Sequence, residues 1–411
     1  MEKNINLIKK IFITLIILII SRIGIFIPVL GINNKKLIIN INKNKIINFL
    51  DIFSGGGFSN IGIFSLGIIP YINSSIITRL ILQIIPQLKE IEKNKENLKE
   101  EKINYITKSL TILWALIQSY AISLWIKPYT TSWNNTIKIE LILTLVTGSM
   151  IIIWFSEMIT KYGIGNGLSL LIFQNIIVNI PKNLKKYKIH NLKKIIIILF
   201  ILLIYIIILM INILIQDSKR KIHILSITQL RKQKKIYVQN YIPLKLNQGG
   251  VMPIIFTSTI ITLLKYVLYH AINNKNLCNK ITKIILSNSF LYIAIYLIII
   301  ININYIYSFI IFNPKDISNN LQKISTHILG VQPGLKTNEY INNIIYKLTF
   351  IGSILLFVIA QSPLIIFKIT QFKLLEELET TSLVILVRII IDTAKQIQTC
   401  IISEQYDNMI M

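Results

Sequence analysis

Long apolar stretches separated by short polar segments run through almost the whole chain. A helix that crosses a bilayer needs about 20 mainly apolar residues, because each residue rises about 1.5 Å and the hydrocarbon core is about 30 Å thick. The pattern predicts roughly ten such crossings, at residues 11–29, 53–86, 109–126, 141–158, 168–180, 195–215, 252–269, 290–312, 345–366 and 382–402. No soluble domain lies between them, so we expect an all-α, polytopic membrane protein.

The second crossing, residues 53–86, is apolar but broken, since Gly55-Gly56-Gly57, Gly67 and Pro70 interrupt it. Lipid offers no hydrogen-bond partners for free backbone N–H and C=O groups. Irregular backbone at membrane depth is therefore tolerated only inside protein or beside a water-filled cavity. We expect this segment to line a pathway.

One short motif occurs twice. Gly67-Ile-Ile-Pro70 opens the intact part of the second crossing, and Gly250-Val-Met-Pro253 opens the seventh. Segments marked by glycine or proline at corresponding places in two halves indicate an inverted repeat with its pathway at the interface. A chance match of so short a motif is the alternative.

The polar segments between crossings differ in charge. Residues 89–108 mix both signs with Glu–Lys pairs at helical spacing, which indicates a solvated loop with helical tendency. Residues 313–343 form a second long connection. An even number of crossings puts both termini and the loops at 219–245 and 313–343 on one side, but the distribution of basic residues does not decide which side. The loop at 219–245 is strongly basic, through Lys219, Arg220, Lys221, Arg231, Lys232, Lys234, Lys235 and Lys245.

Composition supports a membrane protein and excludes an ordinary soluble enzyme, since 53% of the residues are hydrophobic and the mean hydropathy is +0.62. The formal charge of +26 comes from 44 Lys and Arg against 18 Asp and Glu. Part of this excess follows from a bias towards Ile, Asn and Lys, whose codons are rich in A and T. The basic loops remain candidates for binding anionic lipid or ribosomal RNA. Cys278 and Cys400 lie on different segments and indicate neither a disulfide framework nor a thiolate metal site.

Catalytic motifs are missing from the sequence. The four histidines, His190, His223, His270 and His327, form no H-E-x-x-H motif, and neither glycine cluster has the spacing of a nucleotide-binding loop. No G-x-S-x-G nucleophile elbow occurs. We therefore expect a protein that is not an enzyme, with no cofactor and no metal.

Ionisable residues inside crossings would mark an ion-coupled transporter. Glu157 and Asp392 lie near predicted span ends, where solvated carboxylates are the favoured interpretation; Arg22 and Arg388 are further candidates. Arg79 lies among the polar residues Ser74, Ser75, Thr78 and Gln83. This neighbourhood favours a position that faces a water-filled interior. No pair of acidic residues indicates a proton relay. The pattern therefore favours a channel with a narrow hydrophobic constriction. Ile68 and Ile72 would share one helix face there, although such a stripe is also typical of core or lipid-facing positions.

Motifs along nearly the whole chain resemble the SecY/Sec61-alpha family, the channel subunit of the general protein translocase. The chain is similar to the plastid and cyanobacterial type of this family, notably through its ending Asp392-Thr-Ala-Lys-Gln-Ile-Gln398. The other motifs are Arg22-Ile-Gly-Ile-Phe-Ile-Pro28, Phe53-Ser-Gly-Gly56, Leu66-Gly-Ile-Ile-Pro-Tyr-Ile72, Gly163-Ile-Gly-Asn-Gly167, Tyr241-Ile-Pro-Leu-Lys-Leu-Asn-Gln248, Gly250-Val-Met-Pro253, Phe312-Asn-Pro314, Pro333-Gly334 and Thr381-Ser382.

The resemblance implies ten helices in two pseudo-symmetric halves of five, with both termini cytosolic. Residues 1–215 would hold helices 1–5 and helix 6, residues 216–251 a basic cytosolic or stromal loop, and residues 252–411 helices 7–10 with the second loop at 313–343. The implied function is to conduct unfolded polypeptides across the membrane and to release hydrophobic segments laterally. A secondary transporter, with a polar midplane site, and an insertase without a plug are the alternatives.

The resemblance also assigns site residues. A plug at residues 51–64 would include Asp51, Ser54, Gly55, Gly56, Gly57, Phe58 and Asn60. A pore ring would consist of Ile68, Ile72, Leu168, Ile172, Ile255 and Ile385. Polar positions near the lateral gate would be Arg79, Gln118 and Asn166. Loops facing the ribosome and the SecA motor would present Arg231, Lys232, Lys234, Lys235 and Gln332.

Implied partners are a SecE-like small subunit, a SecG-like subunit, the SecA motor, the ribosome, translocating preproteins and the lipid bilayer. The implied location is the plastid thylakoid membrane, with a bacterial plasma membrane as the alternative. Four positions, at three places in the chain, depart from the family pattern. Gln332 stands where an Arg is usual, Arg79 where Gln is frequent, and Glu379-Thr380 where Gly-Gly is usual, so the strength of SecA coupling and the ease of gate opening are open.

Overall fold

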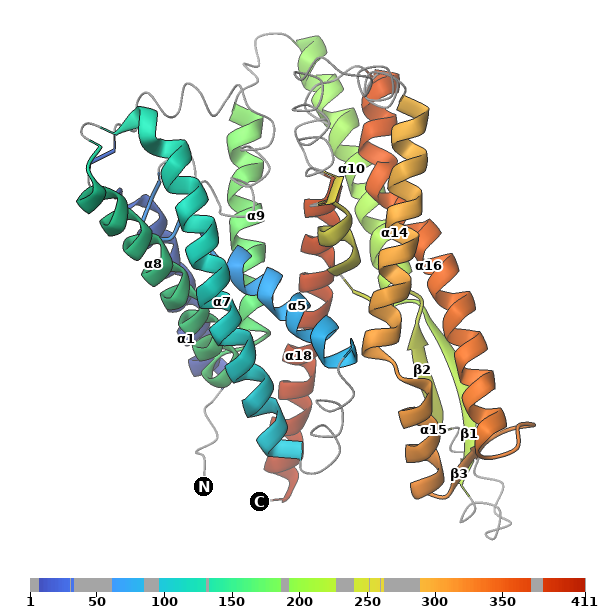
Figure 1. Cartoon of the computed structure of the whole chain (residues 1–411). Helices are drawn as coiled ribbons and strands as arrows, with labels where there is room; N and C mark the ends of the chain where they lie inside the picture. The colour runs from blue at the N-terminus through green and yellow to red at the C-terminus, as the bar shows by residue number, and fades with distance from the viewer. Residues whose placement is uncertain are drawn as a thin grey trace, which may run out of the picture. The chain divides into compact units, whose positions relative to one another are not determined.

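Helices dominate the computed structural model (Figure 1), which describes residues 7–29, 31–32, 61–84, 96–130, 133–185, 192–226, 240–250, 252–258, 260–261, 289–370 and 380–410. Nine of the ten predicted crossings overlap with described helices, and residues 252–258 of the remaining one, the seventh, are helical as well. The nine are α1 (Leu7–Phe26), α5 (Ile69–Ile84), α7 (Glu96–Ile126), α8 (Asn135–Tyr162), α9 (Gly167–Lys185), α10 (Leu192–Asp217), α14 (Ser289–Ile311), α16 (Leu335–Thr370) and α18 (Thr380–Ile410). Of the crossing predicted at 53–86, residues 69–84 are helical, and residues 53–60 lie outside the described residues.

Several of these helices have the length and composition of membrane spans. Within the described part of the chain, the helical stretches long and apolar enough to cross a bilayer are Lys102–Tyr129, Asn135–Tyr162, Ile293–Lys323 and Leu335–Ser362. Gly167–Val178 and Ile206–Asp217 are shorter apolar helices. The prediction of a polytopic membrane protein agrees with these spans.

Two helices extend well beyond their predicted crossings. α7 begins at Glu96, so the second half of the polar segment 89–108 is helical, and α16 begins at Leu335, inside the predicted loop at 313–343. Apolar periodicity marks only the part of a helix that is suited to lipid, while hydrogen bonding continues into polar sequence. The same loop also contains α15 (Pro314–Lys323), which Asn313 caps by accepting a hydrogen bond from the Lys315 N–H at 3.3 Å.

The chain divides into two compact units. The first comprises Met1–Tyr187 and Ile389–Met411, and the second comprises Lys188–Arg388. In the first unit α7 packs against α5 and α8, and α8 packs against α1 and α9. In the second unit α16 packs against α10, α14 and α15. The predicted domain boundaries at 215/216 and 251/252 stay a prediction.

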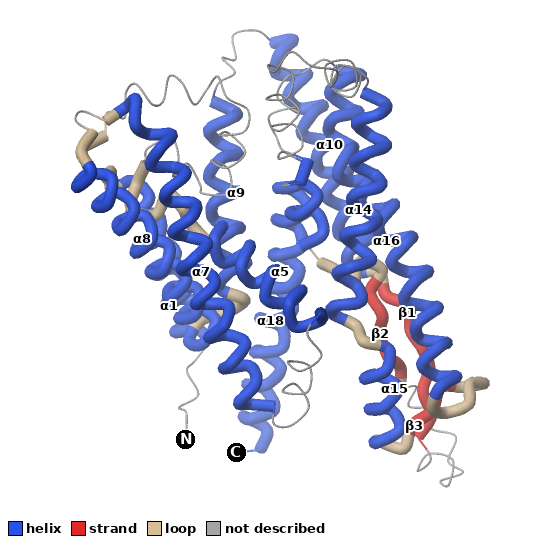
Figure 2. The backbone as a smooth tube through the Cα atoms, viewed as in Figure 1, coloured by secondary structure: helices blue, strands red, loops and turns tan. Residues whose placement is uncertain are grey.

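A small antiparallel sheet in the second unit was not predicted (Figure 2). Its order is β2 (Tyr241–Lys245), β1 (Lys219–Ser226) and β3 (Thr326–Ile328), with Ile222 opposite Ile242 and Leu225 opposite His327. β1 and β2 come from the basic loop and β3 from the later loop, so the two predicted loops form one structure. The sheet packs on a core of Ile222, Leu244, Leu321, Ile328, Ile341, Ile344, Ile345 and Leu348.

Candidate functional site

The glycines that open the two Gly-x-x-Pro motifs share a positive φ angle. Gly67 has φ +55° and Gly250 has φ +68°, both in the left-handed region that favours glycine. Each glycine is followed within two residues by a helix, α5 at Ile69 and the helix of residues 252–258. The correspondence predicted from the sequence therefore extends to the backbone.

Ile72 and Ile255 occupy equivalent places in these two helices, two residues after Pro70 and Pro253. Both side chains are buried, with exposed fractions of 6% and 5%, and Ile68 is buried as well. Three of the six predicted ring residues are thus aliphatic side chains withdrawn from solvent at the start of broken helices.

The turn between α8 and α9 positions the next two ring candidates. Asn166 caps α9, because its side-chain oxygen accepts a hydrogen bond from the Leu168 N–H at 3.1 Å. Gly167 lies directly against α8, where a Cβ at its position would come within 2.0 Å of the Ser156 carbonyl oxygen. α9 therefore starts at a fixed point, with Leu168 half-buried and Ile172 buried.

In the second unit, the residues that precede Ile255 and Ile385 share one hydrophobic core. Ile254 and Val384 are fully buried in it, together with Tyr296, Ile300, Leu356, Ile359 and Ala360. Ile385 itself is fully buried. The first unit holds Ile68, Ile72, Leu168 and Ile172, and the second holds Ile255 and Ile385, so the complete ring stays a prediction.

Of the three predicted gate positions, the structure describes the side chains of two. Gln118 on α7 is partly buried, and its Oε1 atom has no hydrogen-bond partner among the described residues. Asn166 is exposed. The side chain of Arg79 lies outside the described residues.

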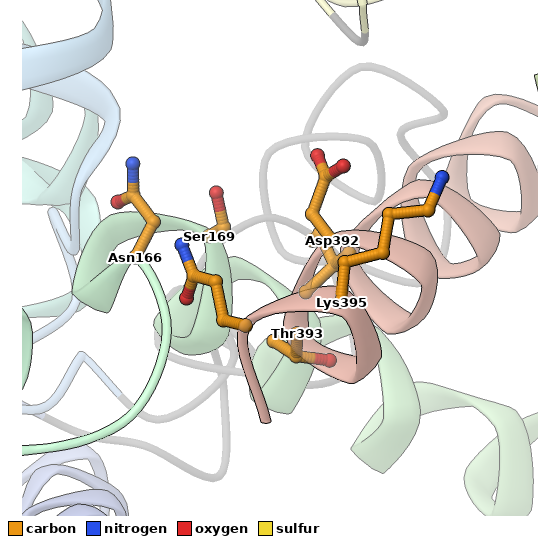
Figure 3. A pocket seen from close by; sticks show the side chains of 7 residues that line it. Asn166, Ser169, Asp392, Thr393 and Lys395 are labelled. Carbon is orange, nitrogen blue, oxygen red and sulfur yellow. The ribbon is translucent and has the colours of Figure 1, made fainter. Parts of the chain in front are cut away.

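Asn166 also lines a polar cavity of about 290 Å³ in the first unit (Figure 3). One wall is the start of α9, with Asn166 and Ser169, and the other is α18, with Ile389, Asp392, Thr393, Lys395 and Gln396. Asp392, which the sequence places near a span end, thus belongs to a cavity wall. Sequence reasoning missed the other α18 residues, although their polar side chains recur at helical spacing.

Residues 61–63, near the end of the predicted plug at 51–64, lie between the segment 25–29, at the end of α1, and α8. The Val29 N–H donates to the Ile61 carbonyl at 3.1 Å, and the Ile63 N–H donates to the Ile27 carbonyl at 3.0 Å. Ile61 is fully buried at φ +41°, a conformation that β-branched residues rarely adopt. The plug residues Asp51, Ser54, Gly55, Gly56, Gly57, Phe58 and Asn60 lie outside the described residues.

Basic side chains project from β1. Lys219, Arg220 and Lys221 are exposed, and the Lys221 ammonium lies 4.8 Å from the centre of the Tyr241 ring on β2. Gln332, on the turn after β3, is exposed. Its backbone carbonyl oxygen accepts a hydrogen bond from Thr337 Oγ1 at 2.8 Å. Arg231, Lys232, Lys234 and Lys235 lie outside the described residues.

Two ionisable side chains of the predicted crossings have partners. Glu157 pairs with Lys108, with 2.6 Å between Oε1 and Nζ, so this carboxylate joins α8 to α7 in addition to being partly solvated. The Arg22 guanidinium stacks over the Phe26 ring at 4.7 Å. Within the part of the chain that the structure describes, no group of three or more His, Cys, Asp or Glu side chains could hold a metal ion.

Comparison with known proteins identifies the family. A sequence profile described as SecY matches residues 62–394. The protein translocase subunit SecY of Pyropia yezoensis is 46% identical over 416 residues, covering 100% of both chains. That of the cyanobacterium Synechocystis is 38% identical over 416 residues, covering 98% of this chain and 93% of the relative.

Solved structures give the fold. A protein-conducting channel has a TM-score of 0.67 at 17% identity, covering 98% of this chain and 95% of that one. Sec61 in a canine ribosome–channel complex has a TM-score of 0.63 at 16% identity, with coverage of 98% and 95%. The predicted SecY-like helical fold and the family resemblance are confirmed. The chain belongs to the SecY family, in its plastid and cyanobacterial branch.

Proposed function

We propose that this chain is the central pore-forming subunit of a Sec translocase, which conducts unfolded polypeptides across a membrane and releases hydrophobic segments laterally. The observation that carries the proposal is the pair of left-handed glycine turns, each opening a helix that buries an isoleucine at the same place. The 46% identical relative is named a protein translocase subunit, which supports the same function.

An aliphatic ring suits this task physically. A narrow apolar constriction excludes water and therefore ions, while flexible aliphatic side chains close around an extended chain of varied sequence. The ring would consist of Ile68, Ile72, Leu168, Ile172, Ile255 and Ile385. The channel itself performs no catalysis in this proposal, so the energy comes from the SecA motor or from the ribosome.

The plug would be residues 51–64, and its two ends would behave differently. Residues 61–63 are hydrogen-bonded to Ile27 and Val29, directly after α1, so we assign the displacement that opens the channel to the residues before Ile61. The positive φ angle of Ile61 marks the junction between the fixed end of the plug and the part that is displaced. Such conformations persist only where the surrounding structure imposes them.

Lateral release requires a seam that opens between helices. We place Arg79, Gln118 and Asn166 near that seam. Among the described residues the Oε1 atom of Gln118 has no hydrogen-bond partner. This supports the assignment, since a buried oxygen atom without a partner costs free energy that a new contact in the open state would recover.

The basic sheet would face the ribosome and SecA. Lys219, Arg220 and Lys221 are exposed, and cations that contact phosphates release counterions, which drives binding to ribosomal RNA. The similar structure of Sec61 in a ribosome–channel complex supports this partner. We propose that Arg231, Lys232, Lys234, Lys235 and Gln332 extend the same surface, that SecE-like and SecG-like subunits complete the channel, and that it acts in the thylakoid membrane.

The decisive experiment is photo-cross-linking to a stalled translocating polypeptide. Probes placed at Ile72 and Ile255 are expected to cross-link to the chain in transit. Probes at Ile19 on α1 and Ile298 on α14, which are 60% and 58% exposed, serve as controls and are expected to reach lipid or partner helices. Cross-links confined to the two control positions would refute a pore through the chain.

A further inference from the structure

Two buried glutamines flank the sheet of the second unit. Gln216 lies three residues before β1, with 1% of its surface exposed, and Gln248 lies three residues after β2, with 5% exposed. A buried amide is costly unless it is hydrogen-bonded, because it gives up its bonds to water. The hydrogen bonds of these two side chains offset part of that cost, although Gln216 Oε1 and Gln248 Nε2 have no hydrogen-bond partner among the described residues.

Gln216 joins the end of α10 to the first turns of α18. Its Nε2 atom donates to the Val384 carbonyl oxygen at 3.2 Å, and to Asn212 Oδ1, one turn back on α10, at 2.8 Å. Asn212 is fully buried. The Val384 carbonyl directly precedes Ile385, so this amide fixes the backbone beside a proposed ring residue.

Gln248 holds the turn that opens the helix of residues 252–258. Its Oε1 atom accepts a hydrogen bond from Ser308 Oγ on α14 at 2.5 Å. A Cβ at the next residue, Gly249, would lie 2.9 Å from Asn304 Oδ1, so the turn runs directly against α14. Ile255 follows within the first turn of that helix.

The sheet connects the two anchors. The Leu246 N–H donates to the Ser218 carbonyl oxygen at 3.2 Å, which joins the residue two after Gln216 to the residue two before Gln248. Ile254 and Val384 also share one hydrophobic core. Apolar packing is non-directional, whereas a hydrogen bond fixes both the rotation and the rise of a helix. The two amides therefore fix the rotation and the axial position of these helices, which the hydrophobic core alone does not set.

We propose that Gln216 and Gln248 are positioning residues, which hold Ile385 and Ile255 in a fixed place relative to the basic sheet. This inference rests on the proposed function, since it assumes that the two isoleucines belong to the pore ring. It follows that these amides contribute to the seal of the resting channel although neither of them belongs to the ring.

The test uses the full chain reconstituted with its partner subunits in proteoliposomes. Gln216→Met and Gln248→Met keep side-chain length and remove the amide, and Gln361→Met, an equally buried glutamine on α16, is the matched control. Gln216→Met removes two hydrogen bonds and Gln248→Met removes one. Each test variant is expected to raise the resting ion leak by about fivefold or more, and to admit precursors with defective signal sequences. The control variant is expected to leak as the unmodified chain does.

Double variants separate positioning from a general loss of stability. Ser308→Ala removes the partner of Gln248, so it should reproduce the leak of Gln248→Met, and the combination should add nothing further. Asn212→Leu removes only one of the two partners of Gln216 and leaves the bond to Val384, so its leak should be smaller than that of Gln216→Met. Adding it to Gln216→Met should add nothing further. Ser308→Ala also tests the bond if Gln248→Met fails to accumulate, because it changes only a hydroxyl group.

The outcomes are distinct. If the unmodified channel transports precursors while Gln216→Met, Gln248→Met and Ser308→Ala all leak no more than Gln361→Met, the inference is overturned and the proposed function stands. Strictly additive leaks in the double variants would also overturn it. If the unmodified, assembled channel transports no precursor, the proposed function itself fails.

Discussion

Gly148 on α8 lies directly against the carbonyl oxygen of Ile63, since a Cβ at the glycine would come within 2.0 Å of that oxygen. Contacts this short do not occur between real atoms, so even a methyl group at position 148 must displace the backbone of residues 61–63. The close packing of α8 against the end of the proposed plug therefore depends on glycine at position 148, which has no side chain.

Gly148→Ala is accordingly expected to displace the plug end and to increase the ion conductance of the resting channel in planar bilayers. A lower midpoint of thermal unfolding should accompany the leak, because steric overpacking typically costs about 1–3 kcal/mol. Thr147→Ala, at the neighbouring exposed position on α8, is the control. Equal conductance for the two variants would mean that this contact does not hold the plug closed.

Polar substitutions in the ring should weaken its seal. Ile72→Asn and Ile385→Asn place an amide in the proposed constriction, which favours its wetting, so ion leakage should rise and signal-sequence selection should relax. Leakage is measured by patch clamp and selection by import of precursors with defective signals. Ile385→Leu keeps an aliphatic side chain of equal volume and should retain the seal. The ring assignment would be wrong if the Asn and Leu variants behaved alike.

Reversing a family departure should change motor coupling. Gln332 stands on an exposed turn, at a position where the family resemblance implies an Arg. If this missing charge limits coupling, Gln332→Arg should raise SecA-dependent transport in vesicles at fixed ATP. Gln322→Arg, which adds the same charge at an exposed position on α15, controls for charge alone. Equal rates for the two variants would show that coupling is arranged otherwise here.

The exposed cations of β1 should determine the salt dependence of ribosome binding. Replacing Lys219, Arg220 and Lys221 by Gln should weaken binding and reduce the slope of log affinity against log salt by about 1 for each RNA phosphate that is no longer neutralised. Sedimentation with ribosomes at several salt concentrations measures this slope. Lys138→Gln, on α8, is the control. An unchanged slope would place the RNA-binding cations elsewhere.

The ion pair between Lys108 and Glu157 should contribute little to stability. Both side chains are more than a third exposed, at 41% and 35%, so solvent and salt screen the attraction. A double-mutant cycle of Lys108→Met and Glu157→Gln should give a coupling of about 0.5 kcal/mol in detergent. The coupling should shrink as salt rises. A coupling that does not change with salt would indicate that the pair is shielded from solvent.

Crossings were predictable because each depends on a local run of apolar residues, and the turn at Gly67 because proline and glycine punctuate a chain locally. The sheet was not, since the basic charge of residues 219–245 indicated a loop, and β3 has only three residues and pairs with β1 about a hundred residues away. The same reason hid Gln216 and Gln248. From the sequence alone, a glutamine at the end of a predicted span is interpreted as solvent-exposed, because its hydrogen-bond partner on another element is not known.

The plan of the first unit has a consequence for biosynthesis. One wall of its cavity comes from the part of α18 that starts at Ile389, which follows the whole of Lys188–Arg388 in the chain and is therefore synthesised after it. The first unit is thus completed only after the second unit has been made. Until this part of α18 emerges, Asn166 and Ser169 lack the opposite wall of their cavity, so a chain truncated before Ile389 carries an incomplete first unit.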